Sequence, residues 1–416
     1  MPLDLSPTIE QECQQHIVAG LKESRERFRS FVSIRNAADA VGATVIRAFG
    51  QKRQKPGWLT AAVVANFVRD RVDAIFEAQR RGTDLLTDEL PAVHEPELTA
   101  AKVVNELRTL PWRYEAWFSV PLIPLALPHG NFVLDDTCRL IRSDRTTSEV
   151  YSLTPVDDSD AASHHRQYPE SVLPDQVYLV GTKVGYIQES ERFDDLREFA
   201  NAAKGLLGLL LVQGGVYFEL LGHRAPPPAV PILLFRLNAE NERPAPGMCR
   251  WFSHDDSATL LRMRPRAEWS SSEDARATLE HVRPAFRDNA TRTAARWFLD
   301  SFAGAEGPLQ VVQATIVLEI LLGDRRESDL LGLASLLSNR LAYLIGQTPK
   351  QRREIVADVK RLYDLRSKIV HSGVAEMDEE GRHALFDLQR YARLALHSQI
   401  GGLAEDDKMG DRPSSG

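Results

Sequence analysis

The chain has 416 residues, more than one hydrophobic core usually organises, so we expect two or three domains and exclude a small disulfide-stapled scaffold. Hydrophobic residues make up 43% and charged residues 26%, which is typical of a globular protein. The 51 basic and 58 acidic residues give a formal net charge of −7, which excludes a protein that coats nucleic acid through its overall charge. Any nucleic-acid partner must therefore bind at a local site.

The sequence carries no sign of a membrane span or of export. No stretch approaches the roughly 18 to 20 consecutive apolar residues of a membrane-spanning helix, so we expect no membrane partner. Residues 1–6 lack the basic and apolar segments of a secretory signal. Cys13, Cys138 and Cys249 form an odd, widely spaced set. We therefore expect a cytoplasmic protein without disulfide bonds.

Residues 1–109 have the spacing of a helical region. Apolar side chains recur every three or four residues over 18–32 and again over 63–75. Thr60 stands where the N-cap of the second of these segments is expected. The sequence therefore predicts an N-terminal helical region, to which we assign no ligand and for which we expect a protein partner.

From residue 110 to residue 240 the composition differs from that of the first region and is rich in Trp, Tyr, Val, Ile and Pro. Alternation predicts a strand with one β-favouring face, formed by Tyr178, Val180, Thr182, Val184 and Tyr186. The apolar spacing over 193–210 predicts a helix that covers this face, and residues 232–237 predict a further strand. We expect an α+β unit here.

Two segments lack regular spacing. In residues 241–289, Pro244, Pro246, Gly247 and several Ser break the regular spacing and predict a loop or linker. Residues 401–416 end in polar, Gly- and Ser-rich sequence and predict a disordered tail. Together with a C-terminal all-α bundle over 290–400, the expected fold class is α+β, mainly α.

Four helices are expected in this bundle, at 310–322, 328–345, 348–371 and 381–398. Their boundaries follow from residues that cap or end helices: Ser328 and Thr348 as N-caps, Pro349 at a first helical position, Gln351 in a capping box, and Gly323, Gly346 and Gly373 as stops. Short links between the helices favour an up-down arrangement.

Two charged residues occupy positions in the bundle where apolar residues are expected. Arg366 fills the remaining place in an apolar stripe formed by Ile355, Val359, Leu362 and Ile369. Glu319 interrupts the apolar run of the first helix. Because unpaired buried charge costs several kcal/mol, each needs a partner or a polar cavity. Either the two residues pair inside the bundle, or Arg366 points to a partner subunit.

Residues 362–373, Leu-Tyr-Asp-Leu-Arg-Ser-Lys-Ile-Val-His-Ser-Gly, resemble the signature of the HEPN superfamily, particularly of its Apea-like branch. The apolar helix with Glu319, the Ser-Asn-Arg-Leu-Ala stretch at 338–342 and the spacing of Tyr363, Arg366 and His371 are similar to that branch and follow in the same order. The resemblance covers about residues 290–400. It implies a homodimeric helical bundle and a metal-independent endoribonuclease, in a role such as prokaryotic stress or phage defence.

By this resemblance, Arg366 and His371 are the candidate catalytic residues, and the supporting residues are Glu319, Tyr363, Ser367 and Lys368. An imidazole can accept the proton of an RNA 2′-hydroxyl or donate one to the departing 5′-oxygen, and a guanidinium stabilises the phosphorane. We therefore expect no metal and no cofactor. On an ideal helix, residues five apart are separated by about 140° around the axis. Either the last turn unwinds, or a two-fold homodimer brings two motifs around one phosphate.

Alternatives remain open for this motif. Arg276 with His281, and Arg390 with His397, fit the same Arg-x4–6-His pattern but lack its context. His371 is also explained as a solvated histidine at a helix C-terminus. The second interpretation is thus a non-catalytic HEPN interaction protein.

Three further observations bear on that choice. Ser367 stands where HEPN nucleases often carry Asn, Asp or His. The seven Lys and Arg residues of the third helix exceed its three acidic residues, which predicts either attraction to a phosphate backbone or a solvated face. His164 and His165 follow the acidic residues Asp157, Asp158 and Asp160, but the spacing does not indicate a metal site.

Overall fold

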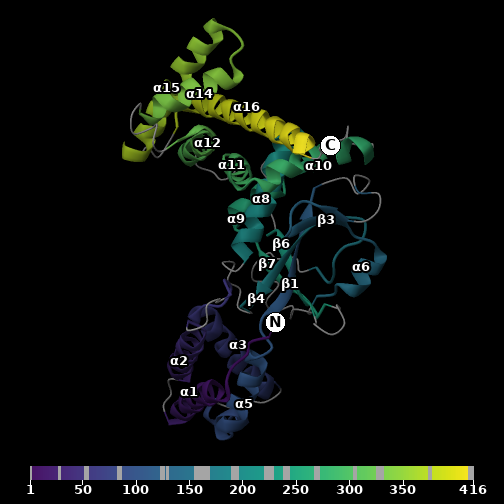
Figure 1. The fold of residues 1–416 in the computed structure, drawn as a ribbon, viewed down its shortest axis with the longest axis vertical. Coiled ribbons are helices and arrows are strands. Elements are labelled where there is room, and N and C mark those ends of the chain that lie inside the picture. The colour runs from purple at the N-terminus through teal and green to yellow at the C-terminus, as the bar shows by residue number, and fades with distance from the viewer. Residues whose placement is uncertain are drawn as a thin grey trace, which may run out of the picture. The chain divides into compact units, whose positions relative to one another are not determined.

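A computed structural model describes most of the chain, drawn as a ribbon in Figure 1. Its contacts divide the chain into two compact units, of which the first comprises Met1–Tyr114, Thr182–Asp195 and Arg236–Ala245. The second comprises Glu115–Gly181, Leu196–Phe235 and Pro246–Gly416. The structure describes residues 2–26, 30–50, 56–81, 87–121, 127, 131–153, 169–188, 196–219, 229–237, 244–266, 272–302, 307–324, 332–372 and 377–410.

The first unit is built on helices, as predicted for residues 1–109. They are α1 (Pro7–Glu26), α2 (Ser30–Gly50), α3 (Ala61–Arg80), α4 (Pro91–His94) and α5 (Pro96–Leu107), with a 3-10 turn at Thr87–Glu89. Thr60 caps α3 as expected, because its Oγ1 accepts a hydrogen bond from the Val63 N–H at 3.1 Å. Phe67 packs edge-to-face on Trp112 and Tyr186, with ring centroids 5.6 and 5.1 Å apart. These aromatic contacts join α3 to the rest of the unit's core.

A six-stranded sheet, most of which lies in the second unit, confirms the α+β prediction. Its order is β2-β3-β4-β1-β6-β7, where the pairs β2–β3, β3–β4 and β6–β7 are antiparallel. The strands are β1 (Trp112–Val120), β2 (Asn131–Val133), β3 (Cys138–Arg142), β4 (Val177–Gly185), β6 (Pro231–Leu237) and β7 (Met248–Trp251). A separate ribbon pairs β5 (Val216–Phe218) with β8 (Met263–Pro265).

Strand β4 lies where the alternation predicts it, but its burial differs from the expected single face. Tyr178, Leu179 and Val180 are all buried, so both faces are covered at its start, and Val184 is exposed. The predicted helix is present as α8 (Arg197–Val212), but the prediction that it covers the face of Tyr178 and Val180 was wrong, because α8 packs on the opposite face, which carries Gly181. A Cβ at Gly181 would lie 2.4 Å from the Phe199 ring, so the glycine allows α8 to pack closely on the strand.

The prediction of a loop or linker over 241–289 was wrong. This segment contains β7, α9 (His254–Leu260), β8 and α10 (Ser272–Arg287). The four residues of β7 carry little spacing signal of their own, because a short strand is specified mainly by its partner, here β6. Pro284 lies inside α10 and contributed to the irregular appearance of the sequence.

The C-terminal part contains α11 (Asn289–Asp300), α12 (Gly307–Leu322), α14 (Leu333–Ile345), α15 (Pro349–Ser372) and α16 (Glu379–Gly410). The last four share one apolar core, which confirms the predicted helical bundle. The capping box of α15 is formed as predicted: Gln351 N–H donates to Thr348 Oγ1 at 3.2 Å, and Thr348 N–H donates to Gln351 Oε1 at 3.1 Å. Ser328 and Gly373 lie outside the described residues, and the N-cap of α14 is Gly332.

The disordered tail predicted for 401–416 was wrong over its first ten residues. Helix α16 continues to Gly410, because Ile400 and Ala404 remain buried and extend its apolar face. Residues 411–416 lie outside the described part of the chain.

Candidate functional site

The structure brings together three of the residues that the sequence singled out. Glu319 of α12 faces Tyr363 and Arg366 of α15, one helical turn apart. Arg366 Nη2 lies 3.6 Å from Glu319 Oε1, and the Tyr363 hydroxyl donates to the same oxygen at 3.1 Å. The guanidinium carbon lies 5.6 Å from the centroid of the Tyr363 ring. Of the two arrangements left open by the sequence, pairing of Glu319 with Arg366 inside the bundle is the one observed in the chain.

This Glu319–Tyr363–Arg366 cluster lies at the edge of the core. The side chains of Arg366 and Glu319 are 23% and 24% exposed. Burial, reinforced by the Glu319 carboxylate, raises the pKa of Tyr363 to about 12, so its phenol keeps its proton and acts as a donor. Arg366 Nε is buried without a hydrogen-bond acceptor among the described residues. The guanidinium is therefore held in place while part of its donor capacity stays unmatched.

The other predicted site residues lie on the same helix but outside this cluster. His371 and Lys368 are exposed, and Ser367 is half-buried. In the described part of the chain, no hydrogen bond or ion pair joins His371 to Arg366. Since α15 remains helical to Ser372, the last turn does not unwind before that residue to bring the two side chains together. Within one copy of α15, the two side chains therefore do not converge.

The two competing Arg-His pairs occupy different surroundings. Arg276 pairs with Glu280 on its own helix at 3.0 Å, and Arg390 pairs with Asp387 at 3.7 Å. Both arginines are largely exposed, unlike Arg366. Burial, with Lys408 and His397 adding repulsion, lowers the pKa of His281. Neither pair combines a half-buried guanidinium with an exposed imidazole.

A second charged cluster, centred on Lys204, was missed from the sequence. Lys204 of α8 lies with Nζ 2.6 Å from both Asp256 Oδ1 of α9 and Asp300 Oδ1 of α11. Burial opposes the charged ammonium, but the two carboxylates outweigh it and raise the pKa of Lys204. Burial also raises the pKa of Asp300, although Lys204 opposes the shift. The Lys204 cluster joins three helices, and its ammonium is paired with two carboxylates.

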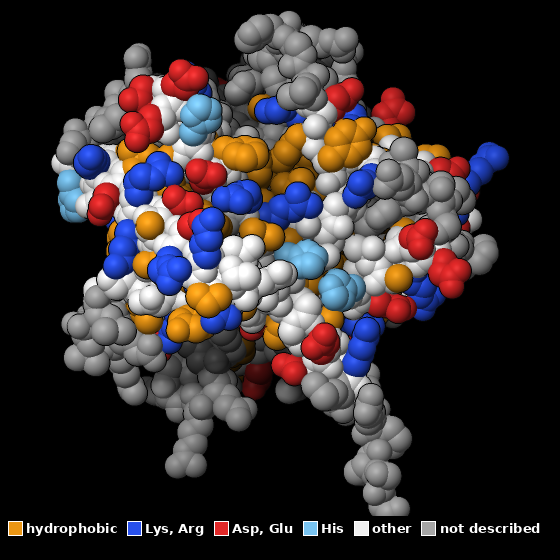
Figure 2. All heavy atoms as spheres, turned by 90° about the horizontal axis from the view of Figure 1, so that it is seen from above, with side chains coloured by type: hydrophobic (Ala, Val, Ile, Leu, Met, Phe, Trp, Pro, Cys, Tyr) orange, Lys and Arg blue, Asp and Glu red, His pale blue; other side chains and the backbone are white. Residues whose placement is uncertain are grey.

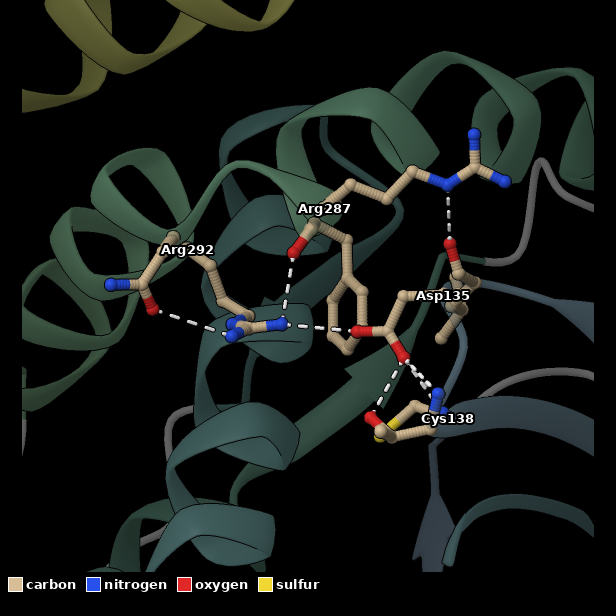
Figure 3. Close-up of polar contacts among 8 residues, drawn as sticks. Asp135, Cys138, Arg287 and Arg292 are labelled. Atoms are coloured by element: carbon tan, nitrogen blue, oxygen red, sulfur yellow. Dashed lines mark hydrogen bonds and ion pairs between the residues drawn. The ribbon is translucent and has the colours of Figure 1, made fainter. Parts of the chain in front are cut away.

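A third polar cluster joins the sheet to the helices (Figure 3). Asp135 Oδ1 accepts hydrogen bonds from the backbone of the β2–β3 turn, including Cys138 N–H at 2.7 Å, and Oδ2 accepts from Arg292 Nη1 of α11 at 3.1 Å. Arg287 Nε donates to the Leu134 carbonyl at 3.0 Å. Burial raises the pKa of the Cys138 thiol to about 11, which keeps it protonated and unreactive. These contacts anchor a turn and do not form a reactive centre.

Comparison with known proteins does not extend these observations. The chain matches no protein-family model, and neither the curated proteins nor the solved structures that were compared with it give a match.

Two further features of the described residues concern membranes and metals. None of the described helices combines the length and apolar character that crossing a membrane requires. His164, His165 and the aspartates before them lie outside the described residues. Within the described ranges, no three His, Cys, Asp or Glu side chains gather as a metal site would require.

Proposed function

We propose that the C-terminal bundle is a HEPN-type endoribonuclease, in which Arg366 and His371 of two copies surround one phosphate of an RNA substrate. The observation that carries the proposal is the Arg366 guanidinium, held at the edge of the bundle by Glu319 and Tyr363 while 23% of its side chain stays exposed. A cation fixed in advance near the surface stabilises developing negative charge without reorganising during the reaction. By the resemblance of 362–373 to HEPN signatures, the biological setting is prokaryotic stress or phage defence.

In the proposed reaction, one imidazole accepts the proton of the 2′-hydroxyl as that oxygen attacks the phosphorus. The P–O5′ bond breaks, and an imidazolium from the second copy returns a proton to the 5′-oxygen. The products are a 2′,3′-cyclic phosphate and a 5′-hydroxyl, so protons and electrons balance without a redox partner. Arg366 stabilises the equatorial oxygens of the phosphorane, where charge accumulates.

A homodimer is needed because one helix does not bring the two side chains together. Around the axis of α15, Arg366 and His371 are about 140° apart. A two-fold axis near the C-terminal end of α15 would place Arg366 of one copy beside His371 of the other. The spacing of the motif on a continuous helix is what supports the proposed homodimer.

The test is cleavage of an end-labelled single-stranded RNA of mixed sequence by the purified full chain in the presence of EDTA. We expect 2′,3′-cyclic phosphate ends, and a loss of at least about 100-fold in His371→Ala, the usual contribution of a general acid–base group. His397→Ala is the matched control, because this exposed histidine belongs to a competing motif. Unchanged cleavage by His371→Ala, or a monomer by light scattering at micromolar concentration, contradicts the proposal.

One observation favours a second candidate, a non-catalytic HEPN interaction protein. The Glu319–Arg366 ion pair neutralises both charges within one chain, which is sufficient for a structural role. In that case the wild-type chain dimerises but leaves RNA intact, and Arg366 serves to hold the interface. Cleavage that depends on His371 contradicts this second candidate.

A further inference from the structure

A groove lies between α14 and α15, apart from the Glu319–Tyr363–Arg366 cluster. Its volume is about 640 Å³, and its polar lining comprises Asn339, Tyr343, Arg352, Arg353 and Lys360. No acidic side chain belongs to the described lining. Figure 2 looks onto the side of the molecule where α14 and α15 lie in Figure 1, and basic, acidic and hydrophobic side chains are mixed on that face.

The spacing of the lining residues explains why they form one surface. Asn339 and Tyr343 are four residues apart on α14, and Arg353 and Lys360 are seven apart on α15, so each pair lies on one side of its helix, and both pairs line the groove. From Arg352 to Lys360 the rise is about 12 Å, which spans several phosphates of a stacked strand at about 3.4 Å each. The groove therefore presents its cations in a row.

An exposed aromatic ring stands in this row of cations. The Tyr343 side chain is 72% exposed, and the Arg352 guanidinium covers one face at 4.8 Å from the ring centroid. Arg352 Nε donates to the Gly346 carbonyl at 3.0 Å, which fixes the guanidinium at the end of α14. A ring supported on one side leaves a surface on which a nucleobase can stack.

Two cations of the groove differ from Lys350 and Arg361 on the same helix. Lys350 pairs with Glu354 at 3.9 Å, and Arg361 pairs with Asp387 at 3.6 Å. Arg353 and Lys360 form no ion pair with any residue that the structure describes, and both are exposed. A solvated charged face is typically balanced by such pairs, whereas this groove keeps its positive charge unbalanced.

From this geometry we infer that the α14–α15 groove binds single-stranded RNA, with phosphates on Arg353 and Lys360 and a base on Tyr343. The inference rests on the proposed function in taking RNA as the ligand, and it adds a positioning surface separate from Arg366 and His371. The overall charge of −7 confines attraction for RNA to such a local site.

The experiment measures binding of a fluorescein-labelled 12-nucleotide single-stranded RNA to the full-length His371→Ala protein, which leaves the RNA intact under the proposed function. Relative to this parent, the added pair Arg353→Glu and Lys360→Glu is expected to weaken binding at least about 10-fold and to lower the salt slope by about 1.4. Adding Tyr343→Ala alone is expected to weaken binding about fivefold or more.

The matched control adds Arg145→Glu and Arg276→Glu, two exposed arginines outside the groove, and makes the same change in net charge. We expect binding within about twofold of the parent, since only local phosphate contacts carry affinity. Equal weakening by this control, or unchanged binding in the groove variants, overturns the inference; circular dichroism verifies that each variant is folded. If the groove variants lose binding but His371→Ala still cleaves RNA, the inference that the groove binds RNA is supported and the proposed active site is contradicted.

Discussion

Lys204 and Arg366 are both single cations on otherwise apolar helix faces of the second unit, yet their surroundings differ. Lys204 is 13% exposed, and two carboxylates lie 2.6 Å from its ammonium. Arg366 is 23% exposed, and one oxygen of Glu319 lies 3.6 Å from its guanidinium. At Lys204, two carboxylates surround one ammonium. At Arg366, a guanidinium with five N–H donors has one long contact with a carboxylate.

This difference separates a cation that holds helices together from one that is available to a ligand. Around Lys204, residues of α8, α9 and α11 meet at one ammonium, whose charge is already matched by two carboxylates. At Arg366, a single oxygen of Glu319 lies 3.6 Å from the guanidinium, and 23% of the side chain remains exposed. Stability should therefore depend on Lys204, and cleavage of RNA on Arg366.

The largest expected effect on stability is that of Lys204→Ala. Removing the ammonium leaves Asp256 and Asp300 without their partner, and breaking a buried pair in this way typically costs about 3–5 kcal/mol of the free energy of unfolding. Urea denaturation followed by circular dichroism measures the loss. The exposed Lys350→Ala provides the control, with an expected change within about 0.5 kcal/mol. If Lys204→Ala lowers the free energy of unfolding by less than about 1 kcal/mol, Lys204 is no more important for stability than Arg366 is expected to be.

The pH dependence of the same variant gives a smaller and more specific effect. Burial raises the pKa of Asp300, and removing Lys204, which opposes that shift, raises it further. An acid with a higher pKa in the folded state binds its proton more tightly there, so lowering the pH stabilises the fold. The deficit of Lys204→Ala should shrink from pH 8 to pH 5, by at most about 1.4 kcal/mol per pH unit for one proton.

Adding Asp300→Asn to Lys204→Ala is the control for this pH effect. The amide cannot ionise, so the deficit should lose most of its pH dependence, measured by the same denaturation. If the double variant retains the full slope, Asp300 is not the group that responds to pH.

The sequence predicted the helices and strands whose own residues specify them. Thr348 and Gln351 place the start of α15, because a capping box acts within four residues. Strand β7 and the end of α16 escaped prediction, because a partner strand and packing far along the chain specify them. Local patterns suffice for the first kind of element and not for the second.

For the site, the interrupted stripe of α15 predicted a sheltered Arg366 with Glu319 as one of two possible partners, and the structure shows this pair. The sequence left open whether the last turn of α15 unwinds toward His371, because a helix end depends on contacts beyond its own residues; the structure shows that α15 stays helical to Ser372. Lys204 was missed although it gives the same signal, a lone cation between the buried Ala203 and Leu206. Like Arg366, Lys204 interrupts the apolar face of its helix, which predicts a buried cation that needs a charged partner.

The smallest expected effect on stability is that of Arg366→Ala. A half-buried pair with one 3.6 Å contact contributes about 1 kcal/mol or less, so unfolding by urea should change little compared with Lys204→Ala. Arg366→Lys sharpens the result, because an ammonium preserves the pairing with Glu319 but lacks the planar donor fork. Under the proposed function, both variants fold and neither cleaves RNA at the wild-type rate. A lysine that restored cleavage would show that charge alone suffices at this position, and a large loss of stability in Arg366→Ala would place Arg366 with Lys204 among the structural cations.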